Sequence, residues 1–344
     1  MPRPSWGLAD WPIRGAASSL RRKRNSPLPF DPAEILGEVL GKPAAGAAPG
    51  SQGAAGGREP RQRQQGFPPG TSEQGVPQVS RPGRTAGFDP ESLDFRCPFI
   101  DSRCIKRSAS LGSEPYPVCS IRRNVGGEPK QICVCPKRFY SVNFLTDVVQ
   151  HCWPGDPPVS PQIAREVKMT GFGNVDFVIA DTEPGGAVTD FLSVELQAID
   201  ITGSVMPAYR ALRADTHLDR RPTYGLNWAN VYKRYITQLI RKGYFHHHWG
   251  TKIVAVMQDV VYDYVCDWAD FMRSHDVKAS TVNIIFMAYR YEDDPAEVGA
   301  QRLVLDRVEG TSHANLQQAV LYKEAPSREA FCEQIQRALL RSPA

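Results

Sequence analysis

Two acidic residues lie in short apolar segments, at positions where a pair of strands would bring them together. Asp176 lies within residues 174–180 (Asn-Val-Asp-Phe-Val-Ile-Ala), and Glu195 lies within residues 193–200 (Ser-Val-Glu-Leu-Gln-Ala-Ile-Asp). Side chains alternate between the two faces of a strand, so each acid should point away from its apolar neighbours. If Gly185-Gly186 forms a two-residue turn, the pairing register places Asp176 directly opposite Glu195. The sequence therefore predicts a hairpin that presents two carboxylates on one face.

Carboxylates in directly opposed positions have Cβ atoms about 4.5–5.5 Å apart and repel each other. They do not both stay ionised unless a proton or a cation lies between them. Mg²⁺ or Mn²⁺ suits such a site, because it accepts one or two carboxylates and completes its coordination with water and substrate phosphate. The alternative is a solvated hairpin face, and the apolar residues that flank both acids argue against it. The pattern favours a site for a hard divalent cation.

A second group of chemically active side chains comes from the eight cysteines of the chain. Five of them lie within residues 97–135, separated by short runs with Gly and Pro in which we expect no regular element: Cys97, Cys104, Cys119, Cys133 and Cys135. The chain shows no export signal, so we expect a reducing compartment, the cytoplasm, in which these thiols do not form disulfides. A loop-rich segment of this length needs a tether, and four thiolates on one Zn²⁺ or Fe ion would provide it. For Cys133 the alternatives are packing, or exchange of a ligand role with Cys135.

The sequence after residue 139 has the pattern of a mixed α/β domain. Helical spacing of apolar residues predicts helices over residues 139–152, 228–242, 262–274 and 327–340, with Asn227 and Ser327 as N-caps. Short alternating or fully apolar runs predict strands at residues 175–180, 191–199, 253–257, 282–288 and 303–306. These strands would form a mixed sheet flanked by helices.

The first ninety residues differ from the remainder in composition. They hold 28 of the 57 Gly and Pro residues, and they carry 12 Lys and Arg against 7 Asp and Glu. We expect this tail to be disordered, because it cannot bury enough apolar surface to offset the entropy of ordering. Residues 91–344 carry 29 basic and 30 acidic side chains, so net charge gives no argument for nucleic-acid binding. No apolar stretch is long enough to span a membrane, and a membrane partner is excluded.

The two groups of side chains together resemble a known family. An acid on one strand and Glu-x-Lys on the next form the core of the PD-(D/E)xK nucleases, and here the second part reads Glu195-Leu196-Gln197, with Gln in the Lys position. The chain is more specifically similar to NotI-type restriction endonucleases over roughly residues 95–290. The matching pieces are Cys97-Pro98-Phe99, Cys104-x-Lys106, Cys119-Ser120, Cys135-Pro136-Lys137-Arg138-Phe139, Glu166-Val167, Gly173-Asn174-Val175-Asp176, Val194-Glu195-Leu196-Gln197-Ala198, Thr202-Gly203-Ser204, residues 238–243 and Trp249-Gly250.

The resemblance implies a restriction-endonuclease-like α/β core in residues 140–344, a four-cysteine metal-binding module in residues 91–139, and a disordered tail in residues 1–90. It implies that Cys97, Cys104, Cys119 and Cys135 hold a structural Fe or Zn ion, and that Asp176, Glu195, Gln197 and Glu166 form an Mg²⁺-dependent centre. It further implies a type II enzyme that cuts double-stranded DNA as a homodimer at a GC-rich palindrome, alongside a cognate DNA methyltransferase.

Contacts to phosphates and bases would come from arginines. The candidates are Arg122 and Arg123 near the cysteines, and Arg210, Arg213, Arg220 and Arg221 in the polar segment after the second acidic strand. Two other functions stay open from the residues alone: a DNA-binding regulator with an inactive nuclease core, and a repair nuclease without restriction specificity.

Overall fold

The central element of the fold is a six-stranded sheet in the order β14-β13-β12-β9-β8-β7. The structure is a computed structural model that describes residues 30–39, 41–43, 90–91, 93–108 and 111–341. The strands of this sheet are β7 (Gln162–Met169), β8 (Gly173–Thr182), β9 (Val188–Gln197), β12 (Lys252–Gln258), β13 (Ile284–Asp293) and β14 (Gln301–Thr311). Strands β9, β12 and β13 run parallel, while the pairs at both edges are antiparallel. All seven residues of β12 are buried, as expected for a central strand covered on both faces.

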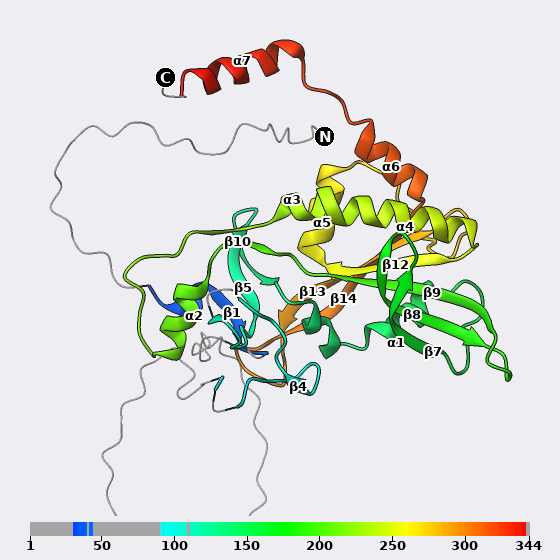
Figure 1. The fold of residues 1–344 in the computed structure, drawn as a ribbon, viewed down its shortest axis with the longest axis horizontal. Helices are drawn as coiled ribbons and strands as arrows, with labels where there is room; N and C mark the ends of the chain where they lie inside the picture. Colours follow the sequence, from blue (N-terminus) through cyan, green and yellow to red (C-terminus); the bar gives the residue numbers. More distant parts are fainter. Residues whose placement is uncertain (1–29, 40, 44–89, 92, 109–110, 342–344) are drawn as a thin grey trace, which may run out of the picture.

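Helices cover both faces of this sheet (Figure 1). On one face, α1 (Phe144–Cys152) and the 3₁₀ turn η3 (Pro136–Ser141) pack with the side chains of Phe177, Val194 and Val254. On the other face, α4 (Ile236–His248), α5 (Asp259–Trp268) and α6 (His313–Leu321) cover the strands, with α4 in contact with both β12 and α6. This arrangement confirms the expected mixed α/β class. Helix α5 begins and ends earlier than the predicted range 262–274.

A second sheet of four strands combines two strands from residues 36–43 with two strands from residues 118–133. Its order is β2 (Lys42–Pro43), β1 (Leu36–Val39), β5 (Val118–Val125) and β6 (Glu128–Cys133). Strand β1 follows the short 3₁₀ turn η1 (Pro32–Glu34), and residues 35, 36 and 39 are fully buried. The expectation of disorder therefore does not hold for residues 30–39 and 41–43, and residues 1–29, 40 and 44–89, on which it also falls, lie outside the described residues. Averaging the composition over ninety residues concealed one short apolar run.

The cysteine segment also contains more regular structure than expected. Strands β5 and β6 form a hairpin through Gly126 and Gly127, both with positive φ, where the sequence suggested loops alone. Upstream, β3 (Arg96–Cys97) and β4 (Ser102–Arg103) form a two-residue ladder. The predicted domain boundary at residue 139 separates segments that pack together, because Gln258 at the end of β12 bonds to the backbone of Gln131 and Cys133 in β6.

A buried ion pair joins three parts of the chain. Arg138 of η3 donates to both carboxylate oxygens of Glu38 in β1 at 2.9–3.1 Å, and also to the carbonyl oxygen of Gln301 at 2.8 Å. Ser120 and Tyr291 donate further hydrogen bonds to Glu38 at 3.2 and 3.3 Å. Both charged side chains are about 95% buried. Strand β1 is thus anchored by charge as well as by apolar packing.

The remaining elements lie outside the two larger sheets. They are β10 (Ile201–Gly203), α2 (Met206–Arg213), β11 (Tyr224–Leu226), α3 (Trp228–Asn230), the π-helical segment η4 (Val231–Tyr235) and α7 (Arg328–Leu339). Asn227 and Ser327 cap α3 and α7 as predicted, accepting from the amides of Asn230 and Ala330. Helix α7 projects from the body and buries none of its residues (Figure 1). Within the described part of the chain, no helix is long and apolar enough to cross a membrane.

Candidate active site

The hairpin that carries the two acids has the predicted register at the site, although its turn differs from the predicted one. Pairing runs from Phe177 with Val194 to Asp181 with Asp190, which is the register expected from a two-residue turn. The turn itself is one residue longer: the amide of Glu183 bonds to the carbonyl of Ala187, and a bulge before Thr182 restores the register. Asp176 lies one residue beyond the Phe177–Val194 pair, on the side away from the turn. Its carboxylate accepts a 2.8 Å hydrogen bond from the amide of Leu196, next to Glu195.

Glu166 joins these acids from the neighbouring strand. Arg165 pairs with Phe177 and Val167 pairs with Val175, so Glu166 lies across from Asp176. Its φ is +52°, a left-handed conformation that is uncommon for a residue with a side chain. Such backbone conformations persist where the surrounding structure enforces them, and they concentrate at functional sites. Three adjoining strands thus place Glu166, Asp176 and Glu195 at one level of the sheet.

The electrostatic behaviour of the acids reflects their proximity and burial. Burial, together with smaller contributions from the charges of Asp176 and Glu166, raises the pKa of Glu195 to about 7. Burial also raises the pKa of Asp176, and the charge of Glu166 adds to this effect. Carboxyl groups with raised pKa values that face one another are typical of catalytic or metal-binding sites.

The sequence analysis did not identify Lys242, although its side chain reaches into this group. Lys242 lies in α4 with only 6% of its side chain exposed, and its Nζ donates to Oε1 of Glu195 and to the carbonyl oxygen of Asn174 at 2.7 Å. Its charge lowers the pKa values of both Glu195 and Asp176. One signal was present in the sequence: Lys242 follows Tyr235 by seven residues and Leu239 by three, so it falls on the apolar stripe of its helix.

A buried histidine holds α4 against β9 close to this ion pair. Nδ1 of His246 contacts the carbonyl oxygen of Lys242 at 2.7 Å, and Nε2 contacts Oγ of Ser193 at 2.7 Å. The carbonyl can only accept, so Nδ1 carries the proton and Nε2 accepts from the serine hydroxyl. Burial lowers the pKa of His246 to about 4, which keeps the ring neutral. The hydrogen bond between His246 and Ser193 fixes the position of α4 along β9, and therefore the position of Lys242.

Tyr235 contributes a polar atom without a partner to the same region. It ends the π-helical segment η4, a type of distortion that is frequent at functional sites. Its hydroxyl is buried and has no hydrogen-bond partner among the described residues. Burial raises the pKa of this hydroxyl, and the charges of Glu195 and Asp176 raise it further, so the phenol lies within the field of both acids. The side-chain amide of Gln197, on the same face, donates to the carbonyl of Ala198 at 2.5 Å.

The donor set fits a hydrated divalent cation in charge and in ligand type. Three carboxylates and one ammonium leave two negative charges when all are ionised, and hard cations prefer oxygen ligands. The partnerless hydroxyl of Tyr235 suits a water ligand of such an ion. With Glu195 turned toward Lys242, no three acidic, histidine or cysteine side chains among the described residues converge on one metal position.

The four predicted cysteine ligands come from four separate segments. Cys97 lies in β3, Cys104 follows β4, Cys119 lies in β5 and Cys135 precedes η3; the first three are buried. Burial raises the pKa of Cys104, and the neighbouring Cys135 and Cys97 raise it further. Burial likewise raises the pKa of Cys119 well above its usual value, again with a contribution from Cys135. These effects link Cys135 to Cys104 and to Cys119 pair by pair, while no three cysteines of the described residues converge on one metal position.

Lys106 and Cys133 complete the surroundings of these thiols. Nζ of Lys106 donates to the carbonyl oxygens of Val118 and Val134 at 2.7 and 2.9 Å, which ties the segments of Cys119 and Cys135 together. The thiol of Cys133 is buried in the core beside α1 and contacts the carbonyl of Cys135 at 3.2 Å. This position agrees with the packing interpretation of Cys133.

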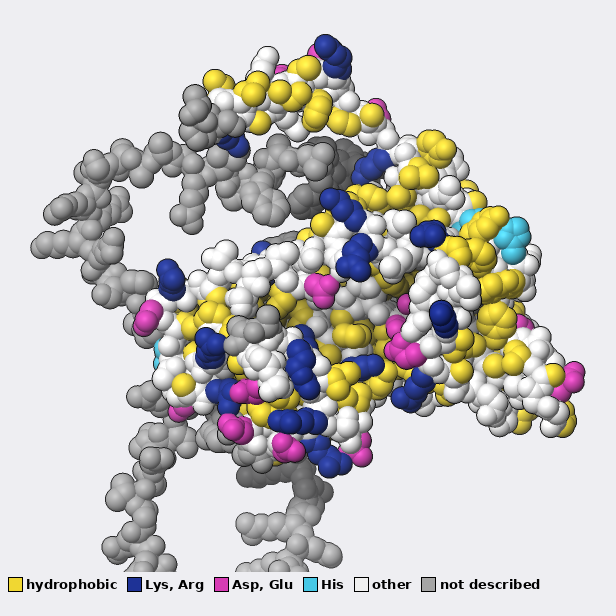
Figure 2. All heavy atoms as spheres, viewed as in Figure 1, with side chains coloured by type: hydrophobic (Ala, Val, Ile, Leu, Met, Phe, Trp, Pro, Cys, Tyr) yellow, Lys and Arg dark blue, Asp and Glu magenta, His cyan; other side chains and the backbone are white. Residues whose placement is uncertain are grey.

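The candidate DNA-binding arginines differ in their surroundings. Arg210, Arg220 and Arg221 are exposed, and Arg122 is half-buried in β5. Arg123 donates to the carbonyl of Tyr224 at 2.8 Å and lies over its ring. Arg213 bonds to Glu91 and Glu114, so it links α2 to the cysteine segment. Lys and Arg side chains are spread over the face drawn in Figure 2, with acidic side chains among them.

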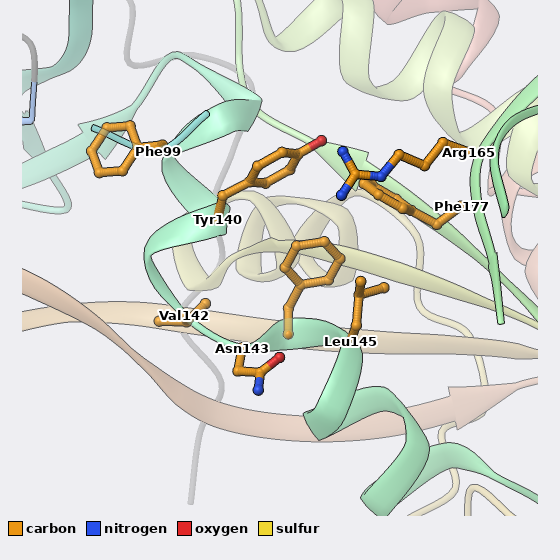
Figure 3. A pocket seen from close by; sticks show the side chains of 8 residues that line it. Phe99, Tyr140, Val142, Asn143, Leu145, Arg165 and Phe177 are labelled. Atoms are coloured by element: carbon orange, nitrogen blue, oxygen red, sulfur yellow. The ribbon is translucent and has the colours of Figure 1, made fainter. Parts of the chain in front are cut away.

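The pocket in Figure 3 lies on the opposite face of the sheet from the acids. Its lining includes Phe177, which packs with α1, and the aromatic rings of Phe99 and Tyr140. The Arg165 guanidinium lies 5.5 Å from the ring centre of Phe177. Asn143 and Arg165 line this pocket together with the aromatic and aliphatic side chains, and the strand itself separates it from Asp176, so the candidate chemistry lies on the other face.

The mixed α/β fold, with its sheet and flanking helices, is consistent with the restriction-endonuclease-like class, and comparison with known families specifies it. The family model for restriction endonuclease NotI matches residues 90–302, more than half of the chain. The chain belongs to the NotI restriction endonuclease family, which confirms the resemblance identified in the sequence. Membership in this family supports the general assignment of the chain as a type II restriction endonuclease. No curated protein matches the chain.

Proposed function

We propose that the protein hydrolyses phosphodiester bonds of double-stranded DNA in a sequence-specific, Mg²⁺-dependent reaction. The observation that carries this proposal is the alignment of Glu166, Asp176 and Glu195 on adjoining strands, with the side chain of Lys242 among them. Family membership supports the same reaction class. Phosphodiester hydrolysis requires an activated water and neutralisation of charge on the phosphoryl oxygens, and this group of side chains can organise both.

Asp176 and Glu195 would hold the Mg²⁺ ion, with Glu166 as the third acid. When bound, the ion lowers the pKa of a coordinated water and polarises the phosphoryl group. The water oxygen bonds to phosphorus, the bond from phosphorus to one ester oxygen breaks, and the proton of the water passes to solvent while the leaving oxygen takes one up. Gln197 is uncharged, so we assign it the orientation of water through hydrogen bonds. Before the ion binds, Glu195 accepts a hydrogen bond from Lys242.

We propose that the four cysteines Cys97, Cys104, Cys119 and Cys135 hold one structural Fe or Zn ion. The mutual electrostatic effects of Cys104, Cys119 and Cys135 support this, as does the tie provided by Lys106. Thiolate ligands in tetrahedral sites suit either metal. The ion would connect β3, β4 and β5 to η3, which carries Arg138.

We further propose a homodimer that cuts both strands of a GC-rich palindrome in the cytoplasm, with a cognate DNA methyltransferase protecting host DNA. A two-fold DNA site matches a two-fold protein. Contacts from Arg122, Arg123, Arg210, Arg220 and Arg221 to guanine edges would fit such a site, while Arg213 would serve mainly to hold α2.

The direct test is incubation of the purified protein with phage DNA and Mg²⁺, followed by mapping of the cut ends. Asp176→Asn should abolish cleavage while DNA affinity and the melting temperature stay close to those of the wild type. Asp181→Asn is the matched control, because Asp181 lies farther along β8 and pairs with Asp190 outside the acidic group. A fixed pattern of fragments supports restriction. Random nicking would favour a repair nuclease, and DNA binding without cleavage would favour a regulator.

The cysteine site has its own test. Cys104→Ser should release the bound metal, measured by elemental analysis, and should lower the melting temperature. Cys332→Ser is the control, because Cys332 lies in the projecting helix α7. An unchanged metal content in Cys104→Ser would remove Cys104 from the ligand set.

A further inference from the structure

The acidic group contains a positive charge that does not come from the strand motif. Strand β9 has Gln197 two residues after Glu195, at the place where a Glu-x-Lys motif has its lysine. A helix supplies the ammonium instead, because Lys242 of α4 donates to Glu195 from a side chain that is 94% buried. Burial of a lysine is costly unless a negative partner compensates it, so this placement depends on the acids.

Lys242 is the cation with the greatest effect on these acids. Burial raises the pKa of Glu195, and Lys242 is the largest influence that lowers it. Lys242 also lowers the pKa of Asp176, and it does so more strongly than Lys137. The ammonium of Lys137 donates to the hydroxyl of Tyr140 at 3.1 Å, on the face that carries α1.

The contacts of the Lys242 ammonium show where it lies. It bonds to Glu195 in β9 and to the carbonyl of Asn174, two residues before Asp176 in β8. These two bonds place the ammonium so that it bridges the strands that carry Asp176 and Glu195. A divalent cation that bridges these strands would have to compete with it for Glu195.

We propose that Lys242 is the resident cation of this active site: it occupies Glu195 until a divalent cation displaces it, and then contacts the scissile phosphate in the role of a strand lysine. This inference rests on the nuclease function proposed above. It assigns Lys242 two separable effects. The ammonium weakens cation binding to the DNA-free protein, and it accelerates cleavage by stabilising the negative charge of the transition state.

The two effects predict changes of opposite sign in Lys242→Met. Binding of Mn²⁺ to the DNA-free protein at pH 8, measured by calorimetry, should become roughly tenfold tighter, because a positive charge leaves the site. Cleavage at saturating Mg²⁺ should fall by about a hundredfold, the usual loss when one charge-stabilising donor is removed. Lys252→Met is the matched control: Lys252 is equally buried, but it bonds only to the carbonyls of Ala279 and Val282. It should leave Mn²⁺ affinity unchanged.

A relocation experiment separates this role from a structural one. Gln197→Lys returns a lysine to the strand position, so the double variant Gln197→Lys/Lys242→Met should recover at least about tenfold in cleavage over Lys242→Met. A lysine that only supported the fold would not be replaced from β9. If Lys242→Met melts below the assay temperature, Lys242→Arg takes its place, and adding Gln197→Lys to it must raise cleavage.

The possible outcomes distinguish this inference from the proposed function. Wild-type protein that cuts no DNA contradicts the nuclease proposal, while the Mn²⁺ titrations still decide whether Lys242 competes with a divalent cation. Wild-type cleavage that is matched by Lys242→Met, or a double variant no faster than the single one, overturns the role of Lys242 alone. Unchanged Mn²⁺ affinity in Lys242→Met overturns its competition for Glu195.

Discussion

Replacement of Glu38 by Gln should reveal how strongly β1 is held to the rest of the protein. Gln keeps the shape of the side chain and removes its charge. The guanidinium of Arg138, about 95% buried, would then lack its counter-ion and keep only neutral partners such as the carbonyl of Gln301 at 2.8 Å. Arginine does not lose its proton in proteins, so the buried positive charge would remain. Loss of one member of a buried pair costs about 3–5 kcal/mol, and we expect a loss of that size.

The assay is urea denaturation followed by tryptophan fluorescence, with the slope of the transition compared between variants. Glu333→Gln is the control: it makes the same chemical change in the exposed pair of Glu333 with Arg337, and it should have no measurable effect. The double change Glu38→Leu/Arg138→Met should recover most of the loss, because an apolar pair leaves no buried charge unpaired. A loss below about 1 kcal/mol in Glu38→Gln would refute this reasoning, since that is the range of surface pairs.

Three further changes test the acidic site. Because burial raises the pKa of Glu195 to about 7, above its usual value, the folded state binds a proton more tightly than the unfolded state, and stability falls as pH rises through this range. Glu195→Gln removes this titration and also the counter-charge of the buried Lys242, so the test is the pH dependence of the difference from the wild type. Relative to the wild type, the variant's free energy of unfolding in urea should rise by roughly 1–3 kcal/mol between pH 5 and pH 8.5; equal differences at both pH values would contradict the burial effect. Tyr235→Phe removes a hydroxyl that has no partner in the described part of the chain, so its melting temperature should not fall, whereas Tyr289→Phe, which loses a 2.5 Å bond to Asp147, should melt lower. Glu166→Gly should raise stability by about 1 kcal/mol through relief of its positive φ and should slow cleavage; destabilisation would show that no strain is stored there.

Local sequence patterns were sufficient to predict most elements that build the site. Alternation in residues 174–180 and 193–200 placed Asp176 and Glu195 on one face, and capping residues located the starts of α3 and α7. These features depend on neighbours within one strand or one helical turn. Strand β1 depends instead on partners about eighty residues away in β5, so its short apolar run had no local signal strong enough to identify it.

Lys242 shows a different limit. Its partner Glu195 lies 47 residues away in the sequence, and only the docking of α4 on β9 through His246 and Ser193 brings them together. A lysine on an apolar helical stripe indicates that a buried counter-charge exists, but it does not indicate which acid provides it. The same holds for Glu166, whose alignment with Asp176 depends on the pairing of β7, a strand with exposed residues along most of its length and no clear alternation.

The hairpin between the acids shows why the predicted alignment was right although the predicted turn was wrong. A longer turn shifts the strands by one residue, and the bulge at Thr182 shifts them back before the pairs that lead to Asp176 and Glu195. Without the bulge, the pairing of Phe177 and Val194 would be lost, and one strand would have to turn its apolar face away from α1. Burial of that face therefore determines the register, and the turn adapts to it. The alignment of the acids on one side of the sheet is thus a consequence of the apolar core on the other side.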